Sequence, residues 1–215
     1  MSQWHVQDAW REKLAAIGIT DLQSALDFRG GTVMSDKKRS RTCKVALADD
    51  GIVFVKHDLS SAWQATLRAL VKFQKPVTKT ERERLCAEHL KQLGFKSYDV
   101  IAWGAKTCCG LPDRAVMVTM PVPGRSMVDI WKDASVSEDQ KQEALKIALE
   151  TLEALQQAGC NWRKDCKPEH FFVTEDRQVY LIDVERMRFG RRPLDEAECL
   201  KQKERFMSFL MPNDS

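Results

Sequence analysis

The chain has 215 residues, of which 43% are hydrophobic and 30% are charged. This length and composition predict a globular protein with one sizeable core or two small lobes, and they exclude two large independent domains. The 34 basic and 31 acidic residues give a net charge of only +3, which by itself does not indicate a nucleic-acid-binding protein.

Two sequence features bear on where the protein is found. The N-terminus has no basic segment followed by an apolar run, and no stretch approaches the roughly 20 apolar residues of a membrane-spanning helix. The seven cysteines are odd in number and include no C-x-x-C pair, which favours reduced thiols. We therefore expect a cytoplasmic protein.

A zinc site is another possible use of the cysteines. It would be formed by Cys160, Cys166, His170 and Cys199, although their spacing fits no structural zinc motif.

The N-terminal part of the chain predicts two short helices and then two strands. Apolar residues at mostly helical spacing run from about Asp8 to Leu26, and Gly18 interrupts them. Residues 32–48 then predict two strands on either side of the basic stretch 37–41.

A third strand carries a lysine in an unusual place. A turn at residues 49–51 leads into the apolar run 52–56, which ends in Lys56. Ile52, Phe54 and Lys56 share one face of this strand, because side chains alternate between the two faces. Lys56 is therefore a candidate functional residue. The alternative is that its aliphatic stem lies along apolar surface while its charge stays in water.

Two helices are predicted next, over residues 60–73 and 78–93, with Lys75 and Pro76 between them. At about 100° per residue, Glu83 falls on the apolar side of the second helix. That side also carries Cys86, Ala87 and Leu90. We therefore expect Glu83 to point inward.

A proline-framed segment marks the predicted boundary between two lobes. Strands are expected at residues 100–103 and 115–120, and Pro121-Val122-Pro123-Gly124 follows them. The rest is mostly helical, with a long helix that begins at a capping box of Ser137 and Gln140 and a last helix over 194–210. The predicted organisation is a helical extension, a strand-rich lobe and a helical lobe, at residues 1–30, 31–120 and 121–215.

Two aspartates carry the chemistry that the sequence predicts. Asp165 lies in a polar loop, and Asp183, eighteen residues later, ends the apolar run 179–182. One carboxylate in a loop can accept a hydroxyl proton, and a second at the end of a buried strand can bind the magnesium of a nucleotide. The pair therefore predicts phosphoryl transfer.

The order of these features resembles the protein-kinase-like fold: strand lysine, helical glutamate, proline-framed hinge, long helix, loop aspartate and strand-end aspartate. Within that fold the chain is similar to the lipopolysaccharide kinase family of the WaaP and InaA type, over about residues 30–188. The most specific part is Asp165-x4-His170-Phe171-Phe172-Val173 with Leu181-Ile182-Asp183. The resemblance implies an α+β, bilobal protein-kinase-like fold, with a small antiparallel-sheet N-lobe and a reduced helical C-lobe.

The resemblance also implies residue roles. Asp165 would take the proton of the acceptor hydroxyl, and Lys167 would neutralise the transferred phosphate. Lys56 would contact the α- and β-phosphates of ATP, and Glu83 would hold this lysine. The metal-binding positions would be Asp183 for Mg²⁺ and His170 for a second metal or phosphate contact, although magnesium prefers oxygen ligands.

The hinge offers a physical argument for adenine binding. Pro121 and Pro123 have no N–H, so Val122 is the one backbone donor between Met120 and Gly124. The Met120 carbonyl would be the matching acceptor.

Three departures from the kinase pattern keep other functions open. No G-x-G-x-x-G loop is present, and Asp183 is followed by Val184-Glu185. Only 23 residues follow Arg192, too few for the substrate platform of a protein kinase, so a peptide substrate is not expected. The basic stretch 37–41 would bind the nucleotide phosphates through its side chains or face an anionic acceptor. The cluster 186–192 would form a solvated face or bind such an acceptor. No stacking aromatic residues interleave them, so nucleic-acid binding is not expected.

The family resemblance implies an ATP-dependent kinase that phosphorylates a heptose or Kdo hydroxyl of the anionic lipopolysaccharide inner core. Such an enzyme would act in the cytoplasm, with peripheral contact to the inner membrane as an option. One alternative is a catalytically inactive, kinase-like regulator of the cell envelope. Another is a small-molecule kinase of the aminoglycoside or choline type.

Overall fold

The computed structural model describes residues 3–60, 71, 76–108 and 111–211. The chain forms two compact units, which we call unit 1 (Met1–Leu85 and Asp99–Pro121) and unit 2 (Cys86–Tyr98 and Val122–Ser215). The helix that we predicted over residues 60–73 lies almost entirely outside the described residues.

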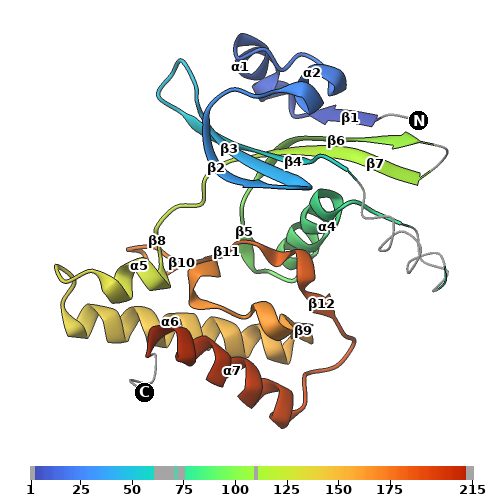
Figure 1. Ribbon diagram of the computed structural model, residues 1–215. Helices are drawn as coiled ribbons and strands as arrows, with labels where there is room; N and C mark the ends of the chain where they lie inside the picture. Colours follow the sequence, from blue (N-terminus) through green and yellow to red (C-terminus); the bar gives the residue numbers. More distant parts are fainter. Residues whose placement is uncertain (1–2, 61–70, 72–75, 109–110, 212–215) are drawn as a thin grey trace. The chain divides into compact units, whose positions relative to one another are not determined.

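Unit 1 is built around an antiparallel sheet. Its described strands number six, in the order β1-β6-β7-β4-β3-β2 (Figure 1). Their bounds are β1 Gln3–Val6, β2 Thr32–Lys37, β3 Ser40–Ala46, β4 Ile52–Asp58, β6 Val100–Cys108 and β7 Leu111–Thr119. The five strand segments expected between residues 32 and 120 are therefore confirmed. Strand β1 was not expected, and it joins the N-terminal residues to the sheet by pairing with β6.

Short helices near the N-terminus cover the hydrophobic side of this sheet. They are the 3-10 turn η1 (Asp8–Trp10) and the helices α1 (Arg11–Ala16) and α2 (Leu22–Asp27). Gly18, at a φ of 88°, separates the two helices, as predicted. Leu14 and Leu26 from these helices pack in one buried cluster with Val55 and Val118 of the sheet.

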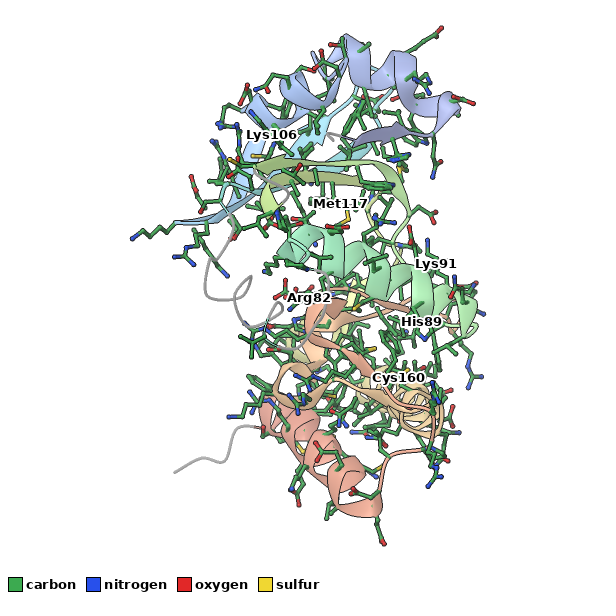
Figure 2. The ribbon with its side chains drawn as sticks, turned by 90° about the vertical axis from the view of Figure 1, so that its right-hand side faces the viewer. Arg82, His89, Lys91, Lys106, Met117 and Cys160 are labelled. Carbon is green, nitrogen blue, oxygen red and sulfur yellow. The ribbon has the colours of Figure 1, made fainter. Side chains whose placement is uncertain are left out.

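Helix α4 (Lys79–Gln92) begins in unit 1, where its first turns pack on the sheet. Thr80 and Arg84 line a small cavity with Trp103 and Met117, and the Arg84 guanidinium lies 3.8 Å from the centre of the Trp103 ring. Met117, labelled in Figure 2, is fully buried in β7. The helix predicted over residues 78–93 is confirmed.

The longest elements of unit 2 are helices. The unit contains α5 (Met127–Lys132), α6 (Glu138–Gln157) and α7 (Glu196–Leu210) (Figure 1). Ser137 and Gln140 form the predicted capping box of α6. The turn after this helix requires glycine, because Gly159 has a φ of 77° and a Cβ there would lie 2.7 Å from the Arg192 carbonyl oxygen.

Short strands and 3-10 turns shape the rest of unit 2. One described sheet has the order β5-β11-β10-β8, and β9 pairs with β12. Strand bounds are β5 Lys96–Ser97, β8 Arg125–Ser126, β9 Cys160–Asn161, β10 Phe171–Val173, β11 Val179–Leu181 and β12 Arg188–Phe189. The 3-10 turns are η2 (Arg163–Asp165), η3 (Pro168–His170) and η4 (Val184–Arg186).

An aromatic cluster forms the centre of unit 2. Trp162, Phe171 and Phe206 are almost completely buried. The rings of Phe171 and Phe206 meet edge to face at 5.0 Å, and those of Trp162 and Phe171 lie 5.2 Å apart. His89, labelled in Figure 2, packs edge-on against Phe189 at 4.4 Å. The cluster fixes β10 and the residue before η2 to helix α7.

No helix among the described residues is long and apolar enough to cross a membrane. The expected reduced state of the cysteines stays a prediction.

Candidate active site

The predicted strand lysine and helical glutamate meet within unit 1. Lys56 of β4 donates a hydrogen bond from Nζ to Glu83 Oε1 of α4. The Glu83 side chain is only 5% exposed and that of Lys56 is 25% exposed. A carboxylate so far removed from water needs a compensating cation, so the pair fixes the direction of the lysine.

The proline-framed segment has the expected pattern of backbone groups. The Met120 N–H donates to the Asp99 carbonyl at 2.9 Å, so this amide is occupied. Within the described ranges the Val122 N–H has no hydrogen-bond acceptor. Thr119, the last residue of β7, is 3% exposed. The roles of the Val122 N–H as donor and of the Met120 carbonyl as acceptor for adenine stay predictions.

The loop that carries Asp165 is anchored in the core of unit 2. The Asp165 N–H donates to the Trp162 carbonyl at 3.1 Å, and the Trp162 N–H donates to the Gln202 side chain of α7 at 3.2 Å. Arg163, between them, has the left-handed φ of 54°. This conformation costs about 1 kcal/mol or more for a residue other than glycine and is concentrated at functional sites. The turn η2 holds Asp165 with 22% of its side chain exposed.

His170 connects the two predicted aspartates. Its Nδ1 donates to the Asp165 carbonyl oxygen at 3.0 Å, because a carbonyl can only accept. Its Nε2 lies 3.7 Å from Asp183 Oδ2 and 3.4 Å from Glu169 Oε1. The ring stacks on Trp162, with the centroids 5.7 Å apart. Packing and the Nδ1 hydrogen bond thus direct Nε2 toward carboxylate oxygens.

Asp183 sits on a tight turn immediately after β11. Its φ of 52° is left-handed, and the preceding Ile182 N–H donates to the His170 carbonyl at 3.1 Å. Half of the Asp183 side chain is exposed, so its carboxylate can reach a ligand. The backbone therefore places this acid beside His170.

Arg186 is a site residue whose individual position the sequence did not predict. Its guanidinium lies 3.2 Å from Asp165 Oδ2, and its Nε lies 3.5 Å from Glu185 Oε1. In the sequence this arginine belongs only to the basic cluster 186–192. Its contact with Asp165 depends on the left-handed turn at Asp183 and on η4, and the sequence pattern predicts neither of them.

Lys167 lies at the outer side of the same loop. Its Nζ is 3.2 Å from Glu169 Oε1 and 5.4 Å from the centre of the Phe209 ring of α7. Its proposed role toward the transferred phosphate stays a prediction.

The residues of unit 2 fit a divalent cation. Asp183 offers exposed carboxylate oxygens, which suit magnesium. A histidine that donates through Nδ1 to a carbonyl presents Nε2 as an electron-pair donor, the arrangement common for metal-bound histidines. The metal roles of Asp183 and His170 remain predictions that this geometry supports.

The zinc alternative finds no support in the described residues. Cys160, Cys166, His170 and Cys199 do not form a group within metal-ligand distance there. Burial raises the pKa of the Cys160 thiol to about 11 and that of Cys166 to about 12, so both stay protonated at neutral pH. Zinc binds the thiolate form.

Comparisons with known proteins identify the family. The family model described as "Lipopolysaccharide kinase (Kdo/WaaP) family" matches residues 25–202, most of the chain. The chain belongs to this family. Members of the family are kinases, so the protein is a phosphotransferase, and the resemblance expected from the sequence is confirmed.

A solved structure supports the fold. The chain is similar to the structure described as "WaaP in complex with acyl carrier protein", with a TM-score of 0.59 and 16% identity. The match covers 98% of this chain and 89% of that one. It is consistent with the kinase-like fold, and the mixture of antiparallel sheet and helices confirms the α+β class. No match was found among curated proteins.

Proposed function

We propose that the protein uses ATP and Mg²⁺ to phosphorylate a sugar hydroxyl, of a heptose or Kdo, in the inner core of lipopolysaccharide. The observation that carries this proposal is the position of His170, which contacts the loop of Asp165 through one ring nitrogen and faces Asp183 with the other. This joins the proposed proton acceptor to the proposed metal ligand. Family membership supplies the acceptor class.

Each of the proposed site residues would have one role in phosphate transfer. Lys56, held by Glu83, binds the nucleotide phosphates, and Val122 and Met120 offer backbone groups to adenine. Asp165 orients the acceptor hydroxyl and receives its proton. Bound Mg²⁺ would neutralise phosphate charge at Asp183, and catalysis of this kind consists mainly of positioning and electrostatic stabilisation.

ATP would be one substrate, and the lipopolysaccharide acceptor at the cytoplasmic face of the inner membrane would be the other. The WaaP structure contains acyl carrier protein, so we propose the same partner for this chain, to be tested by co-purification.

The deciding experiment measures phosphate transfer from radiolabelled ATP to purified inner-core lipopolysaccharide, with and without Mg²⁺. We expect Mg²⁺-dependent labelling by the wild type, and a loss of about 100-fold or more in Asp165→Asn. Labelling of aminoglycosides or choline instead would support the small-molecule kinase. No magnesium-dependent binding of ATP by the wild type would support the inactive regulator.

A further inference from the structure

Helix α7 places an exposed aromatic ring beside the loop that carries Asp165. Phe209, in the last turn of the helix, is 42% exposed. Two cations face its ring: Lys167 Nζ at 5.4 Å and the Arg205 guanidinium at 5.6 Å from the centroid. Lys167 is two residues after Asp165, so a ring that contacts Lys167 lies near the proposed proton acceptor.

The two cations differ in how they are neutralised. Lys167 already pairs with Glu169 at 3.2 Å. Arg205 is half-buried, and its Nε is a buried atom with no hydrogen-bond partner among the described residues. A guanidinium that has lost part of its hydration without a full set of acceptors is stabilised by an anion. The buried Nε itself is not open to a ligand, but among the described residues no carboxylate forms an ion pair with Arg205. Its charge, unlike that of Lys167, is therefore left for a negatively charged ligand.

The charge of Arg205 also acts on the loop that carries Asp165. Burial raises the pKa of the Cys166 thiol, and the positive charge of Arg205 opposes that rise. Cys166 lies between Asp165 and Lys167, so Arg205 acts on the centre of this loop. Helix α7 is also held there by the hydrogen bond between the Trp162 N–H and Gln202.

We propose that Arg205 and Phe209 form a subsite for an acidic sugar of the acceptor. The guanidinium would bind a carboxylate or phosphate on the sugar in a bidentate manner, and the C–H face of the sugar ring would pack on the aromatic ring. Lys167 would border the subsite on the side of the reacting hydroxyl. This inference rests on the proposed function, because it names the part of the acceptor that binds next to Asp165.

Helix α7 offers matched control positions for this subsite. At about 100° per residue, Lys203 lies about 160° around the helix from Arg205, and Leu200 lies about 180° from Phe209. Leu200 is 55% exposed, so this second pair also combines a cation with an exposed apolar residue. Changes there remove one cation and one exposed apolar side chain from the opposite side of the helix.

The test is equilibrium binding of a lipid-free inner-core oligosaccharide that carries Kdo and its phosphates, measured by calorimetry without nucleotide. We expect Arg205→Gln and Phe209→Ala each to weaken binding about tenfold, since each removes one favourable contact of ordinary strength. Lys203→Gln and Leu200→Ala should bind within about twofold of the wild type. Arg205→Lys and Phe209→Leu should give intermediate affinities. They serve as the test variants if Arg205→Gln or Phe209→Ala fails to fold.

Two modified probes identify the anion. A carboxyl-reduced oligosaccharide should lose the Arg205 dependence if the guanidinium binds the carboxylate, and a dephosphorylated one should lose it if it binds phosphate. The subsite is overturned if the wild type binds neither the intact nor the modified probes, or if Arg205→Gln and Phe209→Ala bind as the controls do. Binding is measured apart from turnover. Arg205-dependent binding without phosphate transfer would therefore reject the proposed function and keep the subsite.

Discussion

The guanidinium of Arg186 lies 3.2 Å from the carboxylate of Asp165, so the proposed proton acceptor is held by a cation from the turn that follows Asp183. Arg186 is 66% exposed, and an ion pair this accessible contributes little to folding stability. We therefore expect its role to be the orientation of Asp165, with the charge also available to the transferred phosphate.

This relationship gives the first prediction. Arg186→Gln should lower kcat about tenfold or more, because Asp165 loses the cation that orients its carboxylate, while the KM for ATP changes by less than about threefold. Arg186→Lys should recover part of the kcat. Steady-state kinetics with varied ATP at saturating acceptor measure both quantities, and equal kcat values for wild type and Arg186→Gln would remove Arg186 from the reaction.

The second prediction concerns the nucleotide lysine. Lys56→Met should weaken ATP binding about tenfold and reduce kcat further, because the phosphates lose their cation. Glu83→Gln should have a smaller effect in the same direction, since the lysine keeps its charge and loses its anchor. Calorimetric titration with a non-hydrolysable ATP analogue measures the affinity. As a control, Lys13→Met removes another ion-paired lysine of unit 1 and should leave binding unchanged.

The third prediction separates the metal roles of Asp183 and His170. Asp183→Asn should abolish Mg²⁺-dependent activity, because it removes the charged oxygen ligand. His170→Gln should be milder if magnesium is bound chiefly by oxygen. The concentration of Mg²⁺ or Mn²⁺ that gives half-maximal activity is the measurement, and a larger shift with Mn²⁺ than with Mg²⁺ in His170→Gln would show that Nε2 is a ligand, since manganese accepts nitrogen more readily.

The fourth prediction concerns Gly124, at the end of the proline-framed segment. Gly124 has a φ of 85°, and a Cβ there would lie 2.4 Å from the Val173 carbonyl oxygen. Gly124→Ala should therefore lower the free energy of unfolding by more than about 1 kcal/mol. Urea denaturation measures this. Gly18→Ala is the matched control, because Gly18 has a similar φ of 88° with nothing within 4 Å of the added Cβ, so only backbone strain remains.

The fifth prediction is a pH dependence of stability due to His57. Burial lowers the pKa of His57, whose Nε2 donates to the Ala25 carbonyl at 2.8 Å. The unfolded chain therefore binds a proton at a higher pH than the folded chain, so this contribution is fully present above the unfolded pKa of about 6.5 and is lost as the pH falls below it.

The corresponding measurement is urea denaturation of wild type and His57→Gln between pH 5 and pH 7.5. The wild type should lose more stability than the variant as the pH falls through this window. Parallel pH profiles for the two proteins would contradict the prediction. His170 and the other histidines are present in both, so they cancel in the comparison.

The sequence by itself determined the order of the chemical groups. Alternation along residues 52–56 placed Lys56 on an apolar strand face, and helical periodicity turned Glu83 inward; the structure joins the two in an ion pair. Both arguments succeed because local backbone geometry fixes the direction of a side chain over a few residues. The same is true of the capping box at Ser137, which the structure reproduces.

Contacts between distant segments were decided only by the tertiary structure. The N-terminal residues were expected to be helical, but four of them form β1, because pairing with β6 supplies hydrogen bonds that a local pattern does not reveal. Likewise Arg186 reaches Asp165 through a left-handed turn at Asp183, and Arg205 and Phe209 reach the loop of Asp165 because the buried aromatic cluster packs α7 there. Sequence spacing specifies which groups are present, whereas long-range packing selects which of them meet.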